Sequence, residues 1–276
     1  MNSKLEALLD QRRPLVMGIL NVTPDSFSDG GCYYDYQAAI DHALVMLEQG
    51  ADIVDIGGES TRPGSDPVSK ETELERVIPV VESLRGLTDA CISVDTSTPE
   101  VIEQAAAAGC DLINDVRSLT RGDALSVAAS TMLPVCLMHM QGDPKTMQDN
   151  PSYGNLIDEV CTYFSERIAA CERAGISRER LILDPGFGFG KTSEHNLTLI
   201  NRLKQLDHFR LPILVGLSRK STIGRIVGSN DSLMVGSIAG SLLAVANGAA
   251  IVRVHDVKEM VAALKIAISI QREGLI

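Results

Sequence analysis

The 276-residue sequence lacks several features that would assign it quickly to a class of protein. Its six cysteines show no CxxC or paired spacing, which argues against a disulfide framework and against a zinc site. It contains no tryptophan, and no apolar run is long enough to span a bilayer. Residues 1–14 carry no long apolar stretch of the kind found in secretory signals. We therefore expect a reduced, cytoplasmic protein with no membrane partner.

Basic residues are also too few for a general nucleic-acid binder. Lys and Arg number 25 against 36 Asp and Glu, which gives a formal net charge of −11. A nucleic-acid-binding surface is basic, so we expect no such partner. Apolar residues make up 45% of the chain, enough for a sizeable core. With no linker, charge block or low-complexity segment, the sequence predicts a single domain over residues 1–276.

Eight short apolar runs, rich in β-branched residues, recur along the chain, and each meets a residue able to do chemistry. Helix-patterned stretches separate the runs, which predicts right-handed parallel βαβ units. Eight such units favour a closed (β/α)8 TIM barrel of the α/β class over an open doubly wound sheet. The runs are Leu15–Val22, Asp52–Ile56, Ile92–Val94, Leu112–Val116, Val135–Met138, Leu181–Leu183, Ile213–Leu217 and Ile251–Val254.

The stretches between the runs predict helices with ordinary end signals, such as Thr98 before Pro99 at a start. Two connections, residues 23–36 and 57–70, are long and rich in Gly, Pro, Ser and Asp. Both follow strands, so we expect mobile loops over one face of the barrel. The predicted helices are Tyr36–Gln49, Lys70–Arg85, Pro99–Ala108, Asp123–Thr131, Tyr153–Ala174, Glu194–Gln205, Asp231–Asn247 and Val257–Glu273.

The segment Leu181–Lys191, LILDPGFGFGK, resembles a phosphate-binding loop in part. Pro185 stands where that loop requires its first glycine, and GxGxG is not the GxGxxG spacing of dinucleotide folds. We favour an interpretation in which the three glycines of the segment allow a tight turn or a close approach to a flat ligand.

Cationic and donor side chains gather at the predicted strand ends and loops, namely Arg62, Arg219, Lys220, Arg253 and His255. The segment Ser218–Ser221 also opens a predicted helix, whose free N–H groups favour an anion. In an acidic chain, this collection indicates a site for a strongly anionic group such as a phosphate or diphosphate. A structural ion pair with a neighbouring carboxylate remains the alternative for Arg219 and Arg253.

A second group at strand ends, Asp95, Asn114 and Asp184, has the opposite character. Buried carboxylates need paired donors, and a heterocycle with an amino-pyrimidinone edge presents adjacent N–H groups. Each of these residues, taken alone, could equally make a structural bond at a strand end. For four further residues, structural roles are favoured over functional ones: Asp55, Asp115, His139 and Asp256.

Longer motifs extend these single-residue observations. GILNVTPDSFSDGG (Gly18–Gly31) and DIGGESTRPG (Asp55–Gly64) strongly resemble the two signature segments of the dihydropteroate synthase family. SVDTS, LINDV, LMHMQGDPKTMQ, DPGFGFGK, GLSRKS and RVHDV resemble further motifs of that family. The resemblance runs in order from Pro14 to Val257 and shows no departure inside the motifs.

The resemblance implies a barrel, usually a homodimer, that makes 7,8-dihydropteroate for folate biosynthesis. Such a transferase (EC 2.5.1.15) joins 6-hydroxymethyl-7,8-dihydropterin diphosphate to 4-aminobenzoate and releases diphosphate. It implies a Mg²⁺ cofactor with Asn21 as its ligand, and diphosphate departure followed by amine attack. Because the arylamine needs orientation rather than a strong base, we assign no general base.

The same resemblance implies roles for individual residues. The expected catalytic residues are Asp95, Asp184, Lys220, Arg253 and His255. Contacts to the pterin diphosphate are expected from these five and from Thr61, Asn114, Met138 and Phe189. Contacts to 4-aminobenzoate are expected from Phe27, Thr61, Arg62, Pro63, Ser218 and Ser221.

Two other functions fit part of this pattern. A pterin-binding methyltransferase module of the same superfamily would share the barrel and the carboxylates, but it would have little use for Lys220, Arg253 and His255 together. A non-catalytic paralogue that binds a pterin without turnover would retain the same motifs. An assay of product formation separates these alternatives.

Overall fold

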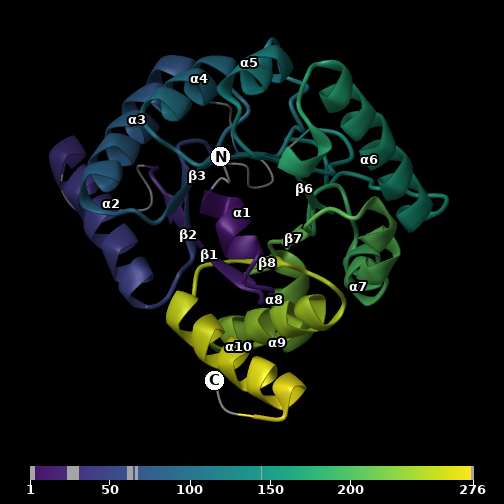
Figure 1. Cartoon of the computed structure of the whole chain (residues 1–276). Coiled ribbons are helices and arrows are strands. Elements are labelled where there is room, and N and C mark those ends of the chain that lie inside the picture. The colour runs from purple at the N-terminus through teal and green to yellow at the C-terminus, as the bar shows by residue number, and fades with distance from the viewer. Residues whose placement is uncertain (1–3, 24–30, 61–64, 66–67, 144, 275–276) are drawn as a thin grey trace.

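The computed structural model describes residues 4–23, 31–60, 65, 68–143 and 145–274, and it shows parallel strands enclosed by helices (Figure 1). The strands are β1 (Leu15–Asn21), β2 (Ile53–Gly57), β3 (Cys91–Asp95), β4 (Leu112–Asp115), β5 (Val135–Met138), β6 (Leu181–Asp184), β7 (Leu214–Val215) and β8 (Ile251–Val254). Their hydrogen-bonded order is β6-β5-β4-β3-β2-β1-β8-β7, and a bridge from Leu183 to Ile213 nearly closes the ring. The predicted TIM barrel is confirmed, and the open-sheet alternative is wrong.

Helices form the outer ring of the barrel (Figure 1). None of those in the described part of the chain is both long and apolar enough to cross a membrane. The α-helices are α1 (Lys4–Leu9), α2 (Gly31–Glu48), α3 (Lys70–Leu87), α4 (Pro99–Ala107), α5 (Ala124–Thr131), α6 (Leu156–Arg173), α7 (Ser193–Asn201), α8 (Ser221–Val227), α9 (Leu233–Ala246) and α10 (Val257–Arg272). Short 3₁₀ turns complete the set at η2 (Arg178–Arg180), η3 (Leu203–Phe209) and η4 (Asn230–Ser232).

The predicted helices are present, with most ends shifted by a few residues. The start of one helix differs from the prediction. Helix α2 begins at Gly31, so the last part of the predicted 23–36 loop is helical. Glycine and aromatic residues are weak helix formers, which made Gly31–Tyr36 resemble a loop. Once the segment after Tyr36 is helical, however, each added residue gains a backbone hydrogen bond at little further cost. Residues 24–30, 61–64 and 66–67 of the two predicted loops lie outside the described residues.

Side-chain alternation divides each strand between two apolar environments. One set of residues, such as Val16 and Leu20 of β1, packs outward against the helices. The alternate set, such as Leu15 and Met17, points into the barrel and forms a separate apolar layer with residues from the other strands. Leu5 of α1, a helix that the sequence analysis did not predict, packs against this inner layer and is 2% exposed. Helix α1 therefore lies against the barrel interior at its amino end.

The register places polar residues directly above that inner apolar layer. In β2, Asp55 follows Ile53 by two residues, and in β8, Arg253 follows Ile251 by two. Because side chains two apart in a strand share a face, both polar residues point into the barrel. The carboxyl ends of the strands thus present charged groups to one interior mouth, with the apolar layer beneath them.

Candidate active site

Arg253 of β8 bonds two carboxylates, from β2 and β3, at the barrel mouth. Its Nε donates to Asp55 Oδ2 at 2.6 Å, and its Nη2 donates to Asp95 Oδ2 at 2.8 Å. Burial opposes the arginine charge, but the Asp55 and Asp95 carboxylates outweigh it and raise the pKa of the guanidinium. Arg253 therefore makes the structural ion pairs that were one interpretation of this residue. It also stands at the mouth, as the other interpretation, an anion site, requires.

Asp55 fixes two further polar groups of the interior. It is fully buried, and it accepts hydrogen bonds from Ser93 Oγ at 2.5 Å and from Asn114 Nδ2 at 3.1 Å. The amide oxygen of Asn114 is then oriented away from Asp55. The structural role expected for Asp55 fits these contacts, yet the residue belongs to the site because it holds Asn114 and Arg253. Sequence analysis missed Ser93, whose small polar side chain inside an apolar strand was the available signal.

Asp95 and Asp184 supply two carboxylates from β3 and β6. Asp95 is 12% exposed at its side chain, and burial raises its pKa above the ordinary value of 3.8 despite the nearby charge of Arg253. Asp184 Oδ1 accepts a hydrogen bond from the Gly186 backbone N–H at 2.8 Å. Burial also raises the pKa of Asp184, and the positive charge of Lys220 opposes the shift. The two carboxylates and Asn114 come from three strand ends that face the same interior.

Lys220 lies over an aromatic ring at the same mouth. Its Nζ is 4.4 Å from the centroid of Phe189 and donates to the Phe187 carbonyl at 2.5 Å. Burial lowers the pKa of Lys220 to about 8, although Asp184 favours the charged form. Residues of the β6–α7 connection and the lysine before α8 therefore form one wall.

The glycine-rich segment after β6 does not form a phosphate-binding loop. The lysine of such a loop must point outward to the phosphate, whereas Lys191 is 2% exposed and turned inward. Lys191 Nζ lies 3.0 Å from the Gly186 carbonyl oxygen and 2.9 Å from His139 Nδ1. Gly186 has a φ of +70°, and a Cβ there would lie 1.9 Å from the His139 carbonyl oxygen. Only glycine fits this approach, in keeping with the tight-turn interpretation.

Several other expected site residues lie around the mouth. His255 bonds Ser218, with its backbone N–H 3.2 Å and its Nδ1 3.0 Å from Ser218 Oγ. Met138, at the end of β5, is buried, whereas Ser221, at the start of α8, is exposed. Asn21 ends β1 in register with Gly57. The expected residues that lie outside the described part of the chain are Phe27, Thr61, Arg62 and Pro63.

Four other polar residues near the strand ends make local contacts, namely Asp115, His139, Arg219 and Asp256. Arg219 pairs with Asp256, which is the structural alternative stated for that arginine. Asp115 is fully buried and accepts backbone N–H bonds from Arg117 at 2.8 Å and from Leu119 at 2.7 Å. His139 is buried, with 5% of its surface exposed, and it contacts Lys191 of the β6–α7 connection. These positions agree with the structural roles favoured for Asp115, His139 and Asp256.

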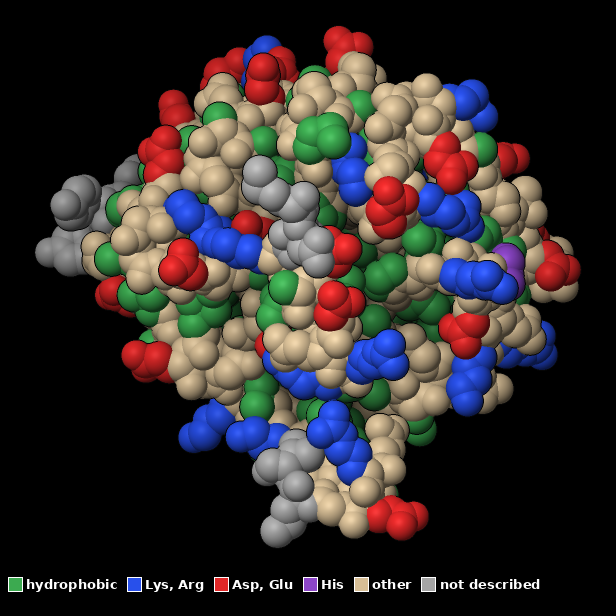
Figure 2. All heavy atoms as spheres, viewed as in Figure 1, with side chains coloured by type: hydrophobic (Ala, Val, Ile, Leu, Met, Phe, Trp, Pro, Cys, Tyr) green, Lys and Arg blue, Asp and Glu red, His purple; other side chains and the backbone are tan. Residues whose placement is uncertain are grey.

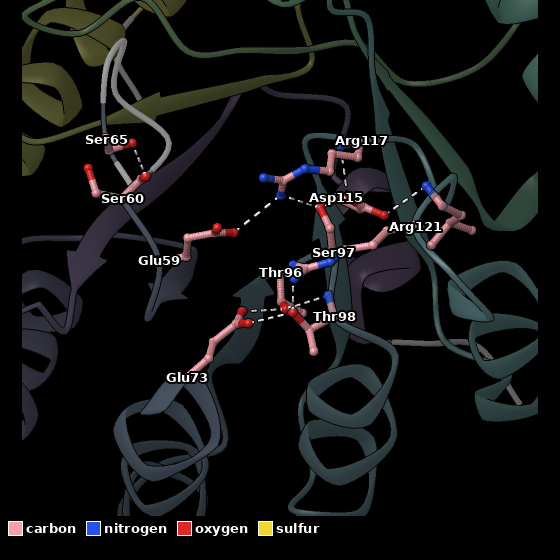
Figure 3. Close-up of polar contacts among 11 residues, drawn as sticks. Glu59, Ser60, Ser65, Glu73, Thr96, Ser97, Thr98, Asp115, Arg117 and Arg121 are labelled. Carbon is pink, nitrogen blue, oxygen red and sulfur yellow. Dashed lines mark hydrogen bonds and ion pairs between the residues drawn. The ribbon is translucent and has the colours of Figure 1, made fainter. Parts of the chain in front are cut away.

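A polar network that the sequence did not indicate joins the connection after β2 to the ends of β3 and β4 (Figure 3). Glu59 faces Arg117 at 3.2 Å, and the same arginine nitrogen is 3.2 Å from Ser97 Oγ. Glu73 of α3 is fully buried, and its two carboxylate oxygens accept from Thr96 at 2.5 Å and from Thr98 at 2.6 Å. The network fixes the described parts of the β2–α3 connection beside the mouth.

The chain is similar in sequence and in structure to known pterin-binding enzymes. The model of a family described as "Pterin binding enzyme" matches residues 17–255. The dihydropteroate synthase of Escherichia coli K12 is 56% identical over 260 residues, covering 94% of this chain and 92% of the relative. The Yersinia pestis dihydropteroate synthase in a sulfonamide drug complex has a TM-score of 0.91 and 52% identity, with 95% of each chain covered.

A third relative has solved structures with two small molecules. The Xanthomonas albilineans dihydropteroate synthase with 4-aminobenzoic acid has a TM-score of 0.90 and 49% identity, covering 95% of this chain and 94% of that one. The same protein in complex with 7,8-dihydropteroate gives 0.86 and 45%, with 95% of each chain covered. These likenesses extend over the barrel and the strand ends described above.

The Arg253→Met substitution tests the energetic role of the central ion pairs. It leaves Asp55 and Asp95 facing each other without a counter-charge, so we expect the free energy of unfolding to fall by about 3–5 kcal/mol. The measurement is equilibrium urea denaturation. The matched control is Lys70→Met, which breaks an ion pair with Glu100 whose side chains are 50% and 42% exposed, and it should change stability by at most about 1 kcal/mol. Equal losses in the two variants would contradict the central role of Arg253.

Proposed function

The chain belongs to the dihydropteroate synthase family of pterin-binding enzymes, and from this membership we propose how its barrel mouth performs the family's reaction. Its activity is the synthesis of 7,8-dihydropteroate, by condensation of a dihydropterin diphosphate with 4-aminobenzoate. The observation that carries the residue assignments is the set of acceptors from β3, β4 and β6, namely Asp95, Asn114 and Asp184, gathered in one interior mouth beside cationic side chains.

Asp95, Asn114 and Asp184 form the floor of the proposed pterin site. The amino-pyrimidinone edge of a pterin presents adjacent N–H donors, which pair with carboxylate and amide oxygens. Asn114 is held by Asp55 through its amide nitrogen, so its oxygen remains available to a ligand. Phe189 and buried Met138 supply apolar surface for the ring, and Lys220 covers it from the side of Phe189.

The diphosphate is assigned to Arg253 and His255 at the rim, together with Thr61. A guanidinium carries five N–H donors, and two described bonds to carboxylates leave others for phosphate oxygens. His255 is oriented by Ser218, which fixes the ring at the end of β8. Positive charge at this position stabilises the negative charge that develops as the diphosphate departs.

Mg²⁺ is the proposed cofactor, with Asn21 as its protein ligand. Asn21 Oδ1 and Asp95 Oδ2 lie 3.8 Å and 3.9 Å from the point that a Cβ on Gly57 would occupy, so both oxygens border one small space. In the described residues no three His, Cys, Asp or Glu side chains form a metal cluster. Mg²⁺ prefers oxygen ligands and keeps several waters, so a site with one amide oxygen from the protein would suit the ion beside a diphosphate. When bound, the ion neutralises charge on the leaving group.

The 4-aminobenzoate is assigned to Ser218 and Ser221 beside α8, with Phe27, Arg62 and Pro63, together with Thr61, from the two long connections. The bond from the pterin methylene carbon to the diphosphate oxygen breaks, a bond from that carbon to the amine nitrogen forms, and one N–H proton is released. The carboxylates of the floor favour the electron-poor ring that develops as the diphosphate leaves. No general base is assigned, because the amine needs orientation and exclusion of water rather than deprotonation.

We also propose that the chain forms a homodimer through α9. One side of this helix packs on the barrel: a Cβ on Gly236 would lie 2.7 Å from Ile223, Ser237 is buried, and Ile238 and Leu242 pack against the core. Its large residues Val235 and Leu243 are 62% and 61% exposed. An apolar helix that still exposes large side chains after packing on the barrel fits a second copy of the chain as its cover.

Three further assignments are proposals of the same kind. We infer a single domain over residues 1–276, because all eight strands share one barrel. A cytoplasmic location is supported by five described cysteines that are free. The absence of a nucleic-acid partner is supported by the surface in Figure 2, where acidic and basic side chains are interspersed on the face shown.

A turnover assay tests the proposed roles of Asp184 and Lys220. The chain is supplied with the dihydropterin diphosphate, 4-aminobenzoate and Mg²⁺, and formation of 7,8-dihydropteroate is followed. Asp184→Asn and Lys220→Ala should each lower kcat/KM by at least about tenfold, or roughly 1.4 kcal/mol. Matched substitutions of exposed residues, Asp149→Asn and Lys204→Ala, should leave it unchanged.

Each outcome of that assay decides between functions. Near-normal kinetics in either site variant would remove that residue from the proposed site. Absence of product from the unmodified chain would remove the synthase assignment, and pterin binding without product would identify the non-catalytic paralogue. The methyltransferase module is disfavoured by the similarity to dihydropteroate synthases over more than nine-tenths of the chain.

The lowered pKa of Lys220, about 8, predicts an alkaline limb in the pH profile. If the charged ammonium contacts the pterin, kcat/KM should fall as pH rises through about 8, because this ratio reports groups of the free enzyme. In Lys220→Arg the remaining charge does not titrate in this range, so whatever activity persists should stay level up to pH 9.5 or so. The same limb in both proteins would assign it to another group.

The Leu243→Glu substitution tests the proposed dimer. A carboxylate at the centre of the exposed apolar face would have to be buried without a partner, so the variant should sediment as a monomer. Leu87→Glu is the matched control, because Leu87 is equally exposed at 61% but lies at the end of α3. A monomer in the unmodified chain, or a dimer in Leu243→Glu, would contradict this interface.

A further inference from the structure

Lys191 is a buried lysine behind the candidate site that the proposed reaction does not use. It is 2% exposed, and its Nζ lies 2.9 Å from His139 Nδ1, 3.0 Å from the Gly186 carbonyl and 3.1 Å from the Phe189 carbonyl. An ammonium group has three N–H donors, and these acceptors, together with the His139 carbonyl at 3.4 Å, occupy all of them. Lys191 therefore has no donor left for a substrate, and any effect on catalysis passes through the groups that it holds.

Holding an ammonium group in this position is energetically unfavourable. Burial lowers the pKa of Lys191 to about 7 and that of His139, its partner, to about 3. A buried charge is costly unless it is fully hydrogen-bonded, and an apolar side chain of similar length would fill the same space without that cost. The arrangement therefore calls for a role beyond filling space.

The acceptors of Lys191 connect two parts of the proposed pterin site. His139 follows β5, whereas Gly186 and Phe189 belong to the turn after β6. The Gly186 N–H holds Asp184 Oδ1 at 2.8 Å, and the Phe189 ring lies 4.4 Å from the Lys220 ammonium. The two residues whose carbonyls Lys191 binds thus orient the carboxylate and the aromatic ring assigned to the pterin.

The turn after β6 makes further hydrogen bonds to neighbouring elements, in addition to those with Lys191. Asn196 is buried, accepts from the Gly188 N–H at 2.7 Å and donates to Thr222 Oγ1 of α8 at 2.9 Å. The Tyr153 hydroxyl donates to the Gly190 carbonyl at 2.7 Å. These bonds attach the turn to α8 and to the β5–α6 connection, while Lys191 attaches it from within.

We propose that Lys191 is a positioning residue for the pterin: its buried ammonium group, shared by His139 and two turn carbonyls, sets the shape of the turn that places Asp184 and Phe189. The inference rests on the proposed function of the mouth, since it names how that same site keeps its form. It predicts that loss of Lys191 affects the pterin and spares 4-aminobenzoate, because no residue of the turn is assigned to the second substrate.

The test is Lys191→Met, with Lys204→Met on exposed η3 as the matched control. Equilibrium titration with 6-hydroxymethyl-7,8-dihydropterin, which lacks the diphosphate, should show a Kd raised at least about tenfold for Lys191→Met and unchanged for Lys204→Met. At saturating pterin diphosphate, the KM for 4-aminobenzoate should change by less than about twofold. A purely structural role would lower the yield of folded protein and leave the Kd of the folded fraction unchanged. An unchanged Kd, or equal effects on both substrates, would overturn the proposal.

Tyr153→Phe provides a second measurement that does not depend on the folding of Lys191→Met. It removes one hydroxyl bond to the turn and keeps the ring that packs near His139 and His195. The Kd for the pterin should rise about threefold with the KM for 4-aminobenzoate unchanged, and an unchanged Kd would overturn the proposal if Lys191→Met does not fold. Turnover of the unmodified chain is assayed separately, so a chain that binds pterin without product refutes the synthase function and leaves the Lys191 test intact.

Discussion

The pairing of Arg253 with Asp55 and Asp95 determines what the barrel interior can hold. Asp55 has no exposure to water, and a buried carboxylate without hydrogen-bonding partners is energetically unfavourable. The guanidinium supplies the counter-charge, and Asp55 also accepts hydrogen bonds from Asn114 and Ser93. The polar layer above the apolar layer therefore depends on one arginine, which also faces the mouth where an anion is expected.

The two lysines of the β6 and β7 connections show how the same side chain serves two purposes. Lys191 turns into the protein and binds carbonyls of its own turn, whereas Lys220 turns toward the mouth over Phe189. Burial lowers the pKa of both lysines, but Lys220 stays partly exposed whereas Lys191 is buried. Glycines at positive φ, such as Gly186, make the difference possible because they let the backbone curl around the inward lysine.

Much of the site could be predicted because parallel topology and side-chain alternation act on every strand alike. Asp95, Asn114 and Asp184 stand at strand ends, so a barrel brings them to one mouth whatever the helices do. The contacts of Asp55 could not be predicted, since its bond to Arg253 joins residues 198 apart and exists only when the ring closes. The start of α2 escaped prediction because local propensity at Gly31 is weak and extension from the following helix decides it.

Helix α1 covers the barrel interior at the amino end of the strands. Its Leu5 packs against the apolar layer at the amino end, and the charged layer lies above that layer, at the carboxyl end of the strands. A ligand of the charged layer would therefore enter and leave at the carboxyl end, so both substrates and both products share one opening.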